Sequence, residues 1–160
     1  MPAADGSLAR LQAIIDRSAA TAGPAMLRNF IGPGWRMSAG ELAAFFASPR
    51  MASVSTTSTT GRVHVAPLEV TLVDGRFRIP TYPDSRRLRD HRANTRCAIA
   101  SWEDAYHAVI VYGTARELRP DAIAAHLEAS QGYGAGSMVT IEVEPTHIYA
   151  IRPPAGHPHA

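Results

Sequence analysis

The sequence predicts a mainly β fold, an antiparallel β-barrel of about six strands with short helices at its ends. Three observations carry this prediction. After residue 50, β-branched and other apolar residues alternate with polar ones at a period of two, which is typical of strands. The pairs Thr60-Gly61 and Asp74-Gly75 mark tight turns between strands. The length of 160 residues, 46% hydrophobic and 19% charged, suits one globular domain with its own core.

Charge and cysteine content narrow the class of protein. Sixteen basic against fourteen acidic residues leave a net charge of +2, which is too weak for a general nucleic-acid-binding surface. No stretch approaches about 18 apolar residues, and the N-terminus lacks the apolar core of a signal peptide. We therefore expect a cytoplasmic protein with no membrane or nucleic-acid partner. The only cysteine, Cys97, lies in an apolar run and is expected to be buried.

Residues 1–37 are predicted to form an N-terminal extension. Ser7 can cap a short helix whose apolar residues share one face, namely Leu8, Leu11, Ile14 and Ile15. Glycines and prolines interrupt residues 21–35 too often for a long regular element, so this segment is expected to be a linker. Ser38 and Glu41 form a capping box, which indicates that the barrel domain begins at 38; it is predicted to end at 152, with 153–160 as a tail.

The first predicted hairpin joins a strand over 51–57 to one over 62–73. In the second strand the apolar residues change from odd to even positions at Ala66-Pro67. A change of phase exchanges the two faces of a strand, so we expect a β-bulge that bends the strand there.

The remaining elements alternate between strands and polar segments. A short polar helix is predicted over 84–92, capped by Asp84 or Ser85, and another helix is predicted after Pro120. Phe45, Phe46 and Trp102 are expected in the core. The further strands are predicted over 76–81, 96–102, 106–118 and 138–149.

The segment from Pro80 to Arg89 carries hydroxyl and guanidinium groups where a strand ends and a helix begins. Free backbone N–H groups and the positive end of the helix dipole attract an anion at such a point, and arginine adds bidentate donors. The pattern indicates a phosphate site. A solvated face of surface arginines is the alternative interpretation.

The order of elements and this segment resemble the pyridoxamine-phosphate-oxidase-like split β-barrels, a family that binds flavin. In that family a strand ending in threonine is followed by serine, any residue, and then a lysine or arginine that holds the flavin phosphate; here these are Thr81, Ser85 and Arg87. The resemblance continues through 97–102, 109–118 and 139–146. It covers roughly residues 38–152 and implies an antiparallel split barrel.

The resemblance also implies a cofactor site. The two hydroxyls would bind phosphate or ribityl oxygens, the two arginines would neutralise the phosphate, and the bend in the second strand would contact the isoalloxazine ring through its backbone. The implied residues are Val65, Ala66, Pro67, Pro80, Thr81, Ser85, Arg86 and Arg87.

The function that the resemblance implies is a flavin-dependent oxidoreductase acting on a small organic substrate, with FMN as cofactor and a homodimer that holds it between the subunits. Family members with a basic residue on the second strand gain an extra partner for the cofactor, whereas positions 66 and 71 hold alanine and threonine. A deazaflavin-dependent reductase, or a non-enzymatic flavin- or haem-binding module, is therefore the alternative. His64 and His107 could reach a pocket, but a lone histidine on a strand is more often structural. We assign no catalytic residue and expect no metal site.

The chain departs from the oxidase itself near its C-terminus. Gly134-Ala135-Gly136 stands where that enzyme has an aromatic residue, and Arg152 is followed by Pro153-Pro154 instead of the spacing of an Arg-x-His pair. The phosphate of a pyridoxamine phosphate substrate would lack its second cationic partner. We therefore expect a less charged substrate.

Overall fold

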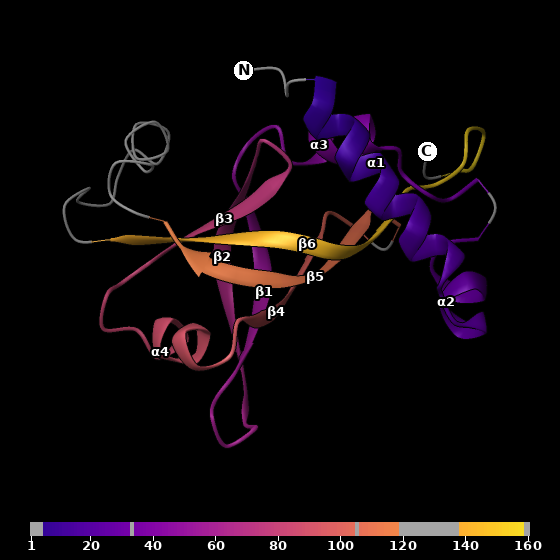
Figure 1. Ribbon diagram of the computed structural model, residues 1–160. Coiled ribbons are helices and arrows are strands. Elements are labelled where there is room, and N and C mark those ends of the chain that lie inside the picture. Colours follow the sequence, from indigo (N-terminus) through magenta and orange to yellow (C-terminus); the bar gives the residue numbers. More distant parts are fainter. Residues whose placement is uncertain (1–4, 33, 105, 119–137, 159–160) are drawn as a thin grey trace.

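Six antiparallel strands close into a barrel in the computed structural model, which describes residues 5–32, 34–104, 106–118 and 138–158 (Figure 1). The barrel order is β1-β2-β3-β6-β5-β4, and β4 returns to pair with β1. The predicted mainly β, antiparallel barrel is thus confirmed. The strands are β1 Arg50–Thr57, β2 Val63–Val73, β3 Arg76–Thr81, β4 Arg96–Trp102, β5 Ala108–Glu117 and β6 Val139–Ile151.

Short helices flank the barrel. The helices α1 and α3 lie close together on one side, and α4 lies on the opposite side (Figure 1). The predicted helix after Pro120 and the glycines at 132–136 lie outside the described residues. None of the helices in the described ranges is long and apolar enough to cross a membrane. The helices are α1 Asp5–Ala20, α2 Pro24–Asn29, α3 Ala39–Phe45 and α4 Arg86–Ala93.

The N-terminal extension packs onto the barrel. Leu11, Ile14 and Ile15 of α1 are buried and join the same core as the strands. The hydroxyl of Ser18 accepts a hydrogen bond from the Ile148 backbone N–H of β6 at 3.0 Å. The segment expected to be a linker contains α2, which starts with a proline in its first turn, where the missing N–H is not needed. The domain boundary at residue 38 stays a prediction.

The bulge expected at Ala66-Pro67 is absent. The β1–β2 register runs without interruption from Arg50 opposite Val70 to Thr57 opposite Val63. The odd-numbered Val63 and Val65 face outward and are 61% and 63% exposed, so the change of phase marks apolar residues on the outer surface. Trp102 was expected in the core because it is apolar, but this prediction is wrong. Trp102 is 59% exposed on the outer side of β4.

The register shift occurs instead in the β5–β6 ladder, between Tyr112 and Gly113. A Cβ atom at position 113 would lie 2.5 Å from the backbone oxygen of Glu144, which is too close for any side chain. Only glycine therefore fits at this crossing.

The expected burial of Phe45, Phe46 and Cys97 is confirmed. Phe45 and Phe46 are buried, and Phe46 packs edge-on against Phe77 of β3 with ring centroids 5.3 Å apart. Cys97 is 7% exposed, and its burial raises the pKa of the thiol to about 12.

We predict that α1 stabilises the barrel through its buried face. Leu11→Ala should lower the free energy of unfolding by about 2–5 kcal/mol, because it removes a fully buried side chain and leaves a cavity. Leu27→Ala on α2, at a side chain 43% exposed, is the matched control and should change it by less than about 0.5 kcal/mol. Urea unfolding followed by circular dichroism measures both. Equal stability of the two variants would show that α1 is not part of the cooperative unit.

Candidate functional site

A pocket opens where β2, the end of β3 and the start of α4 meet. Its volume is about 240 Å³. Its wall is mostly apolar, and its polar groups come from β2, the end of β3, the segment that follows β3 and the first turn of α4. This composition suits an organic ligand held at one polar end. The lining residues are Met51, Pro67, Leu68, Glu69, Pro80, Thr81, Tyr82, Ser85, Arg87 and Met138.

The helix α4 starts at this pocket because Ser85 caps it. Ser85 has an extended backbone, and its hydroxyl accepts a hydrogen bond from the Leu88 N–H at 3.2 Å. The Thr81 hydroxyl lies 3.0 Å from the Ser85 hydroxyl, so one of them donates to the other. The end of β3 and the cap of α4 therefore place two hydroxyls side by side at the pocket.

Arg87 adds a positive charge to the same wall. Its side chain is half-buried, and its Nε atom is buried without a hydrogen-bond partner among the described residues. Burial lowers the pKa of the guanidinium, and the nearby Asp90 carboxylate opposes this shift. A buried N–H left without an acceptor costs about 1–3 kcal/mol, and such a group in a native structure calls for an explanation. An anion in the pocket would supply the acceptor.

The structure brings five of the eight sequence-predicted residues to this pocket, namely Pro67, Pro80, Thr81, Ser85 and Arg87. The other three do not line it. Arg86 is exposed to solvent, Val65 faces outward, and Ala66 points to the barrel interior beside Val54. Successive residues of a strand face opposite sides, so Val65, Ala66 and Pro67 cannot all present side chains to one ligand.

The backbone of β2 remains available beside the pocket. The ladder from β2 to β1 has eight residue pairs, whereas its ladder to β3 has only three, from Thr71 to Val73. Within the described residues, 63–70 therefore have a strand on one side only. Backbone N–H and C=O groups on the free side need partners. The expected contact of this backbone with a flavin ring stays a prediction.

Several lining residues were not predicted from the sequence. Tyr82 lies within the segment from Pro80 to Arg89 that the sequence predicts as a phosphate site, so its position in the chain is enough to predict that it lines the pocket. Glu69 shares the outer face of β2 with Pro67, two residues away, and a period-two count would have found it. Met51 lies opposite Glu69 on β1, a pairing that only the register reveals. For Met138, before β6, the sequence gives no signal.

A buried carboxylate fixes α4 against the strands. Asp90 is 5% exposed and accepts hydrogen bonds from the Thr56 hydroxyl of β1 and from His64 Nδ1 of β2, each at 2.7 Å. Burial alone would raise the pKa of Asp90, but these hydrogen bonds and the nearby imidazoles hold it below its usual value. His64 thus joins β2 to α4. His107 instead contacts Asp104, with Nδ1 and Oδ2 3.0 Å apart, away from this pocket.

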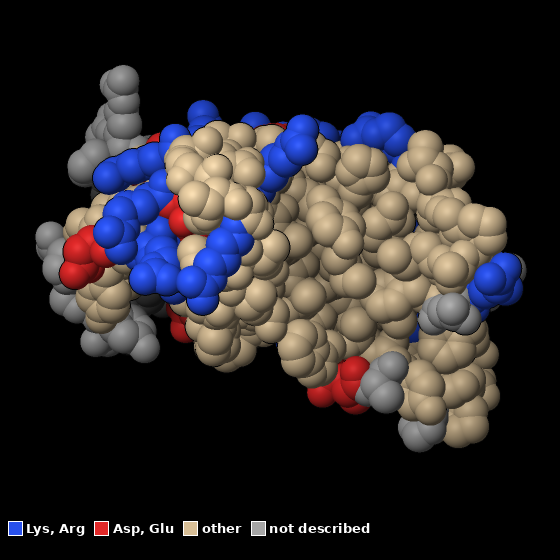
Figure 2. Space-filling view, turned by 90° about the horizontal axis from the view of Figure 1, so that it is seen from below, with Lys and Arg blue, Asp and Glu red and all other residues tan. Residues whose placement is uncertain are grey.

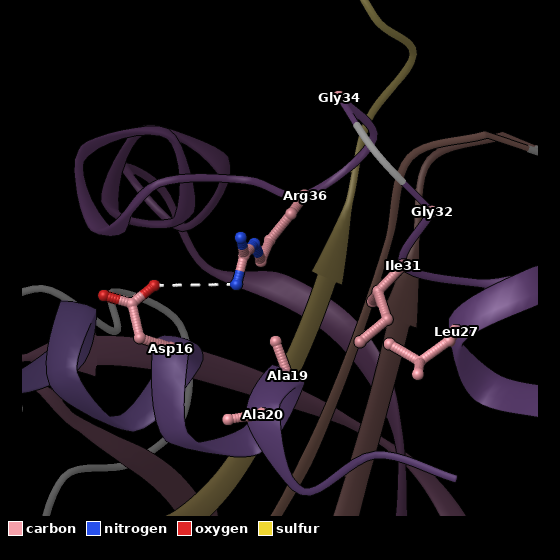
Figure 3. Close-up of a pocket in the computed structure, with 8 residues that line it drawn as sticks. All are labelled: Asp16, Ala19, Ala20, Leu27, Ile31, Gly32, Gly34 and Arg36. Carbon is pink, nitrogen blue, oxygen red and sulfur yellow. Dashed lines mark ion pairs between the residues drawn. The ribbon is translucent and has the colours of Figure 1, made fainter. Parts of the chain in front are cut away.

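Two other regions are separate from the site. A cavity of about 590 Å³ lies between the end of α1, α2 and the segment that carries Ile31, Gly32, Gly34 and Arg36 (Figure 3). Arg36 Nη1 and Asp16 Oδ1 are 3.7 Å apart there. The second region surrounds Arg152. Its guanidinium forms an ion pair with the Glu41 carboxylate and donates a hydrogen bond to the Pro153 carbonyl oxygen at 2.9 Å. The stretch Gly134–Gly136 lies outside the described residues.

Comparison with known proteins identifies the family. A family model described as pyridoxamine 5'-phosphate oxidase matches residues 38–152, well over half of the chain. The chain therefore belongs to the pyridoxamine 5'-phosphate oxidase family. No curated protein sequence matches it.

Solved structures share the fold at low sequence identity. A conserved hypothetical protein from Mycobacterium tuberculosis aligns with a TM-score of 0.65 and 16% identity, covering 76% of this chain and 88% of the other. An F420 reductase aligns at 0.57 and 18%, covering 66% and 93%. The heme storage protein HutZ from Vibrio cholerae aligns at 0.60 and 13%, covering 70% and 93%. These similarities show the split-barrel fold.

We predict that the Asp90 carboxylate stabilises the fold in its ionised form. Because its folded pKa is lower than its unfolded value, this stability is present above the unfolded pKa and is lost as the pH falls through the folded pKa. Asp90→Asn should lower the free energy of unfolding by about 1.5–3 kcal/mol at pH 7, and the difference from wild type should shrink below about pH 4.

Urea unfolding at pH 7, 5 and 3 measures this effect. Asp84→Asn, at an exposed carboxylate just before α4, is the matched control and should change stability by less than about 0.5 kcal/mol. A deficit in Asp90→Asn that is as large at pH 3 as at pH 7 would contradict the role of the charge.

Proposed function

We propose that this protein binds FMN in the pocket between β2, β3 and α4 and acts as a flavin-dependent oxidoreductase on a small organic substrate. The observation that carries the proposal is the buried Nε of Arg87, which has no partner among the described residues and lies on a pocket wall shared with two hydroxyls. A phosphate offers several strong acceptors, so it fits this set of donors.

Each part of the pocket has a role in this proposal. Arg87, Thr81 and Ser85 bind the phosphate end, and Pro67 with the free backbone side of β2 lies toward the ring. When bound, the flavin ring supplies the hydride or electron transfer. The protein orients the ring and excludes water from it, which explains why the pocket needs no nucleophile activated by a base.

A deazaflavin coenzyme is the second candidate. It carries a phosphate on a similar tail, and one structural relative is an F420 reductase. Arg86 and Arg89 are exposed on α4 beside the pocket, and Figure 2 shows arginines gathered at one end of the molecule. Positive charge there favours a cofactor whose anionic tail extends beyond the pocket.

We predict that Arg87 and Arg86 contribute unequally to cofactor binding. Arg87→Ala should weaken FMN binding about ten- to a hundredfold, since a charge-assisted hydrogen bond contributes roughly 1.5–3 kcal/mol. The solvated Arg86 should contribute less, so Arg86→Ala, the matched control, should change affinity less than about threefold. Flavin fluorescence quenching measures both.

Absorbance and mass spectrometry of the protein as purified identify which cofactor it carries and decide between FMN, a deazaflavin and haem. If neither arginine variant changes the affinity, the phosphate site is wrong and the arginines form a solvated surface.

The outer face of β2, β1, β4 and β5 supports a proposal that the protein is a homodimer with the cofactor at the subunit interface. The register places Val65, Ser55, Ala98 and Tyr112 in one row across these strands. Val65 and Tyr112 are 63% and 44% exposed, and Met51 and Trp102 extend the same face. A wide area without charged side chains is visible beside the arginines in Figure 2. Exposed apolar surface of this kind is typical of an interface.

We predict that Ala98→Arg disrupts this dimer. The substitution places a charge at the centre of the row, where a partner subunit would bury it. Sedimentation velocity at micromolar concentration should show a dimer for the wild type and for the control Leu27→Arg, which changes an exposed residue on α2, and a monomer for Ala98→Arg. A wild-type protein that is monomeric with cofactor bound would overturn the proposal.

A further inference from the structure

Buried polar atoms without partners concentrate around α4. Five such side-chain atoms occur among the described residues, and four of them belong to His64, Arg87 and His91. His91 is the most unusual of these, because it is 4% exposed and neither of its ring nitrogens has a hydrogen-bond partner. A buried imidazole normally donates from one nitrogen and accepts at the other. The anion site at Arg87 and the hydrogen bonds of Asp90 do not explain why His91 is buried.

Arg87 and His91 are four residues apart on α4, so they lie on the same face of the helix, one turn from each other. Arg87 lines the pocket. His91 does not line it and is buried one turn further along. A charge placed beside Arg87 in the pocket is therefore within electrostatic reach of His91, because a buried imidazole is screened less than an exposed one.

The charged groups that face His91 come from its own helix and from β5. Asp90 and Arg87 act on it from α4, and Glu117 acts on it from β5. Glu117 is also bound by Arg92, whose Nε lies 2.6 Å from its carboxylate. Two other strands, β1 and β2, also contact α4. They contribute Thr56 and His64, and both side chains donate a hydrogen bond to the Asp90 carboxylate.

These groups act in opposite directions on the imidazole. Burial lowers the pKa of His91, and the positive charge of Arg87 lowers it further. The carboxylates of Asp90 and Glu117 raise it. The repulsion from Arg87 is the contribution that a ligand can change, because an anion on the guanidinium neutralises it.

We propose that His91 takes up a proton when an anion binds at Arg87, so that anion binding and protonation of this buried imidazole favour each other. The proposal rests on the anion site of the proposed function and adds a proton-linked residue to it. Thermodynamic linkage makes the effect reciprocal: the bound anion stabilises the imidazolium, and the imidazolium raises the affinity for the anion.

The sign of the pH dependence follows from this linkage. With anion bound, His91 should titrate at a higher pH than in the free protein. The gain in anion affinity is complete at a pH below the pKa of His91 in the free protein. It is lost as the pH rises through the pKa of His91 in the anion complex. A shift of about one pKa unit corresponds to a tenfold gain in affinity.

Sulfate is the appropriate probe, because it stays doubly charged throughout the titration range of histidine and adds no titration of its own. We expect the imidazole signal of His91 in proton NMR to titrate about one unit higher in sulfate than in chloride at equal ionic strength. The signal is assigned by its loss in His91→Gln. If that variant does not fold, single substitutions of the other histidines assign it by elimination.

Affinity provides the second measurement. Sulfate binding by wild type, and by the control His147→Asn at an exposed histidine of β6, should strengthen about tenfold as the pH falls through this range. His91→Gln should bind weakly at every pH in the range. Arg87→Ala should show neither sulfate binding at this site nor a shift of the His91 signal.

The outcomes separate this inference from the proposed function. Sulfate binding that depends on Arg87 while the His91 titration stays unchanged, or while only His64 shifts, would overturn the inference and leave the anion site intact. Sulfate binding that does not depend on Arg87 would overturn both. An upward shift of His91 in the wild type that is absent from Arg87→Ala supports both.

Discussion

The closure of the barrel at β6 is the constraint on which the rest of the structure depends. β6 pairs with β3 on one side and with β5 on the other. On its outer face the buried Glu142 carboxylate accepts hydrogen bonds from Arg78 of β3 at 3.2 Å and from Arg116 of β5 at 2.6 Å. Removal of one arginine would leave a buried charge with too few partners, which is strongly destabilising. The ion pairs therefore hold all three strands together.

The position of the candidate site follows from this closure. The β3–β6 ladder ends with Thr81 opposite Val139, so β6 determines where β3 stops and where the chain turns into α4. β2 pairs with β3 over only three residues, which leaves one side of its backbone free at the same place. The pairing is thus long on both sides of β6 but short between β2 and β3, and the pocket forms where the β2–β3 pairing stops.

The sequence was sufficient to predict the strands, the order of elements and the segment that carries the pocket hydroxyls, because period-two alternation and helix caps are local signals. The sequence pattern was misleading where an apolar side chain was assumed to face the core. Val63, Val65 and Trp102 are apolar and exposed, which produced a false bulge and a false core residue. Apolar residues on the outer face of a strand repeat with the same period as those of the core, so periodicity alone does not separate the two.

The polar cluster around α4 could not be predicted for a different reason. Residues 84–92 are so polar that they suggest a solvated helix, yet Asp90 and His91 are buried. Their burial depends on Thr56 and His64, which are distant in sequence and reach Asp90 only through the register of β1 and β2. Contacts between a helix and two strands leave no local pattern in the sequence.

The burial of Cys97 has a consequence for how the protein tolerates oxidants. With a thiol pKa raised to about 12 by burial, Cys97 is protonated at pH 7, whereas the thiolate is the form that oxidants attack. The only sulfhydryl of this chain is thus shielded from oxidants by its burial in the barrel wall. A disulfide between Cys97 and another thiol would therefore require the barrel to open first.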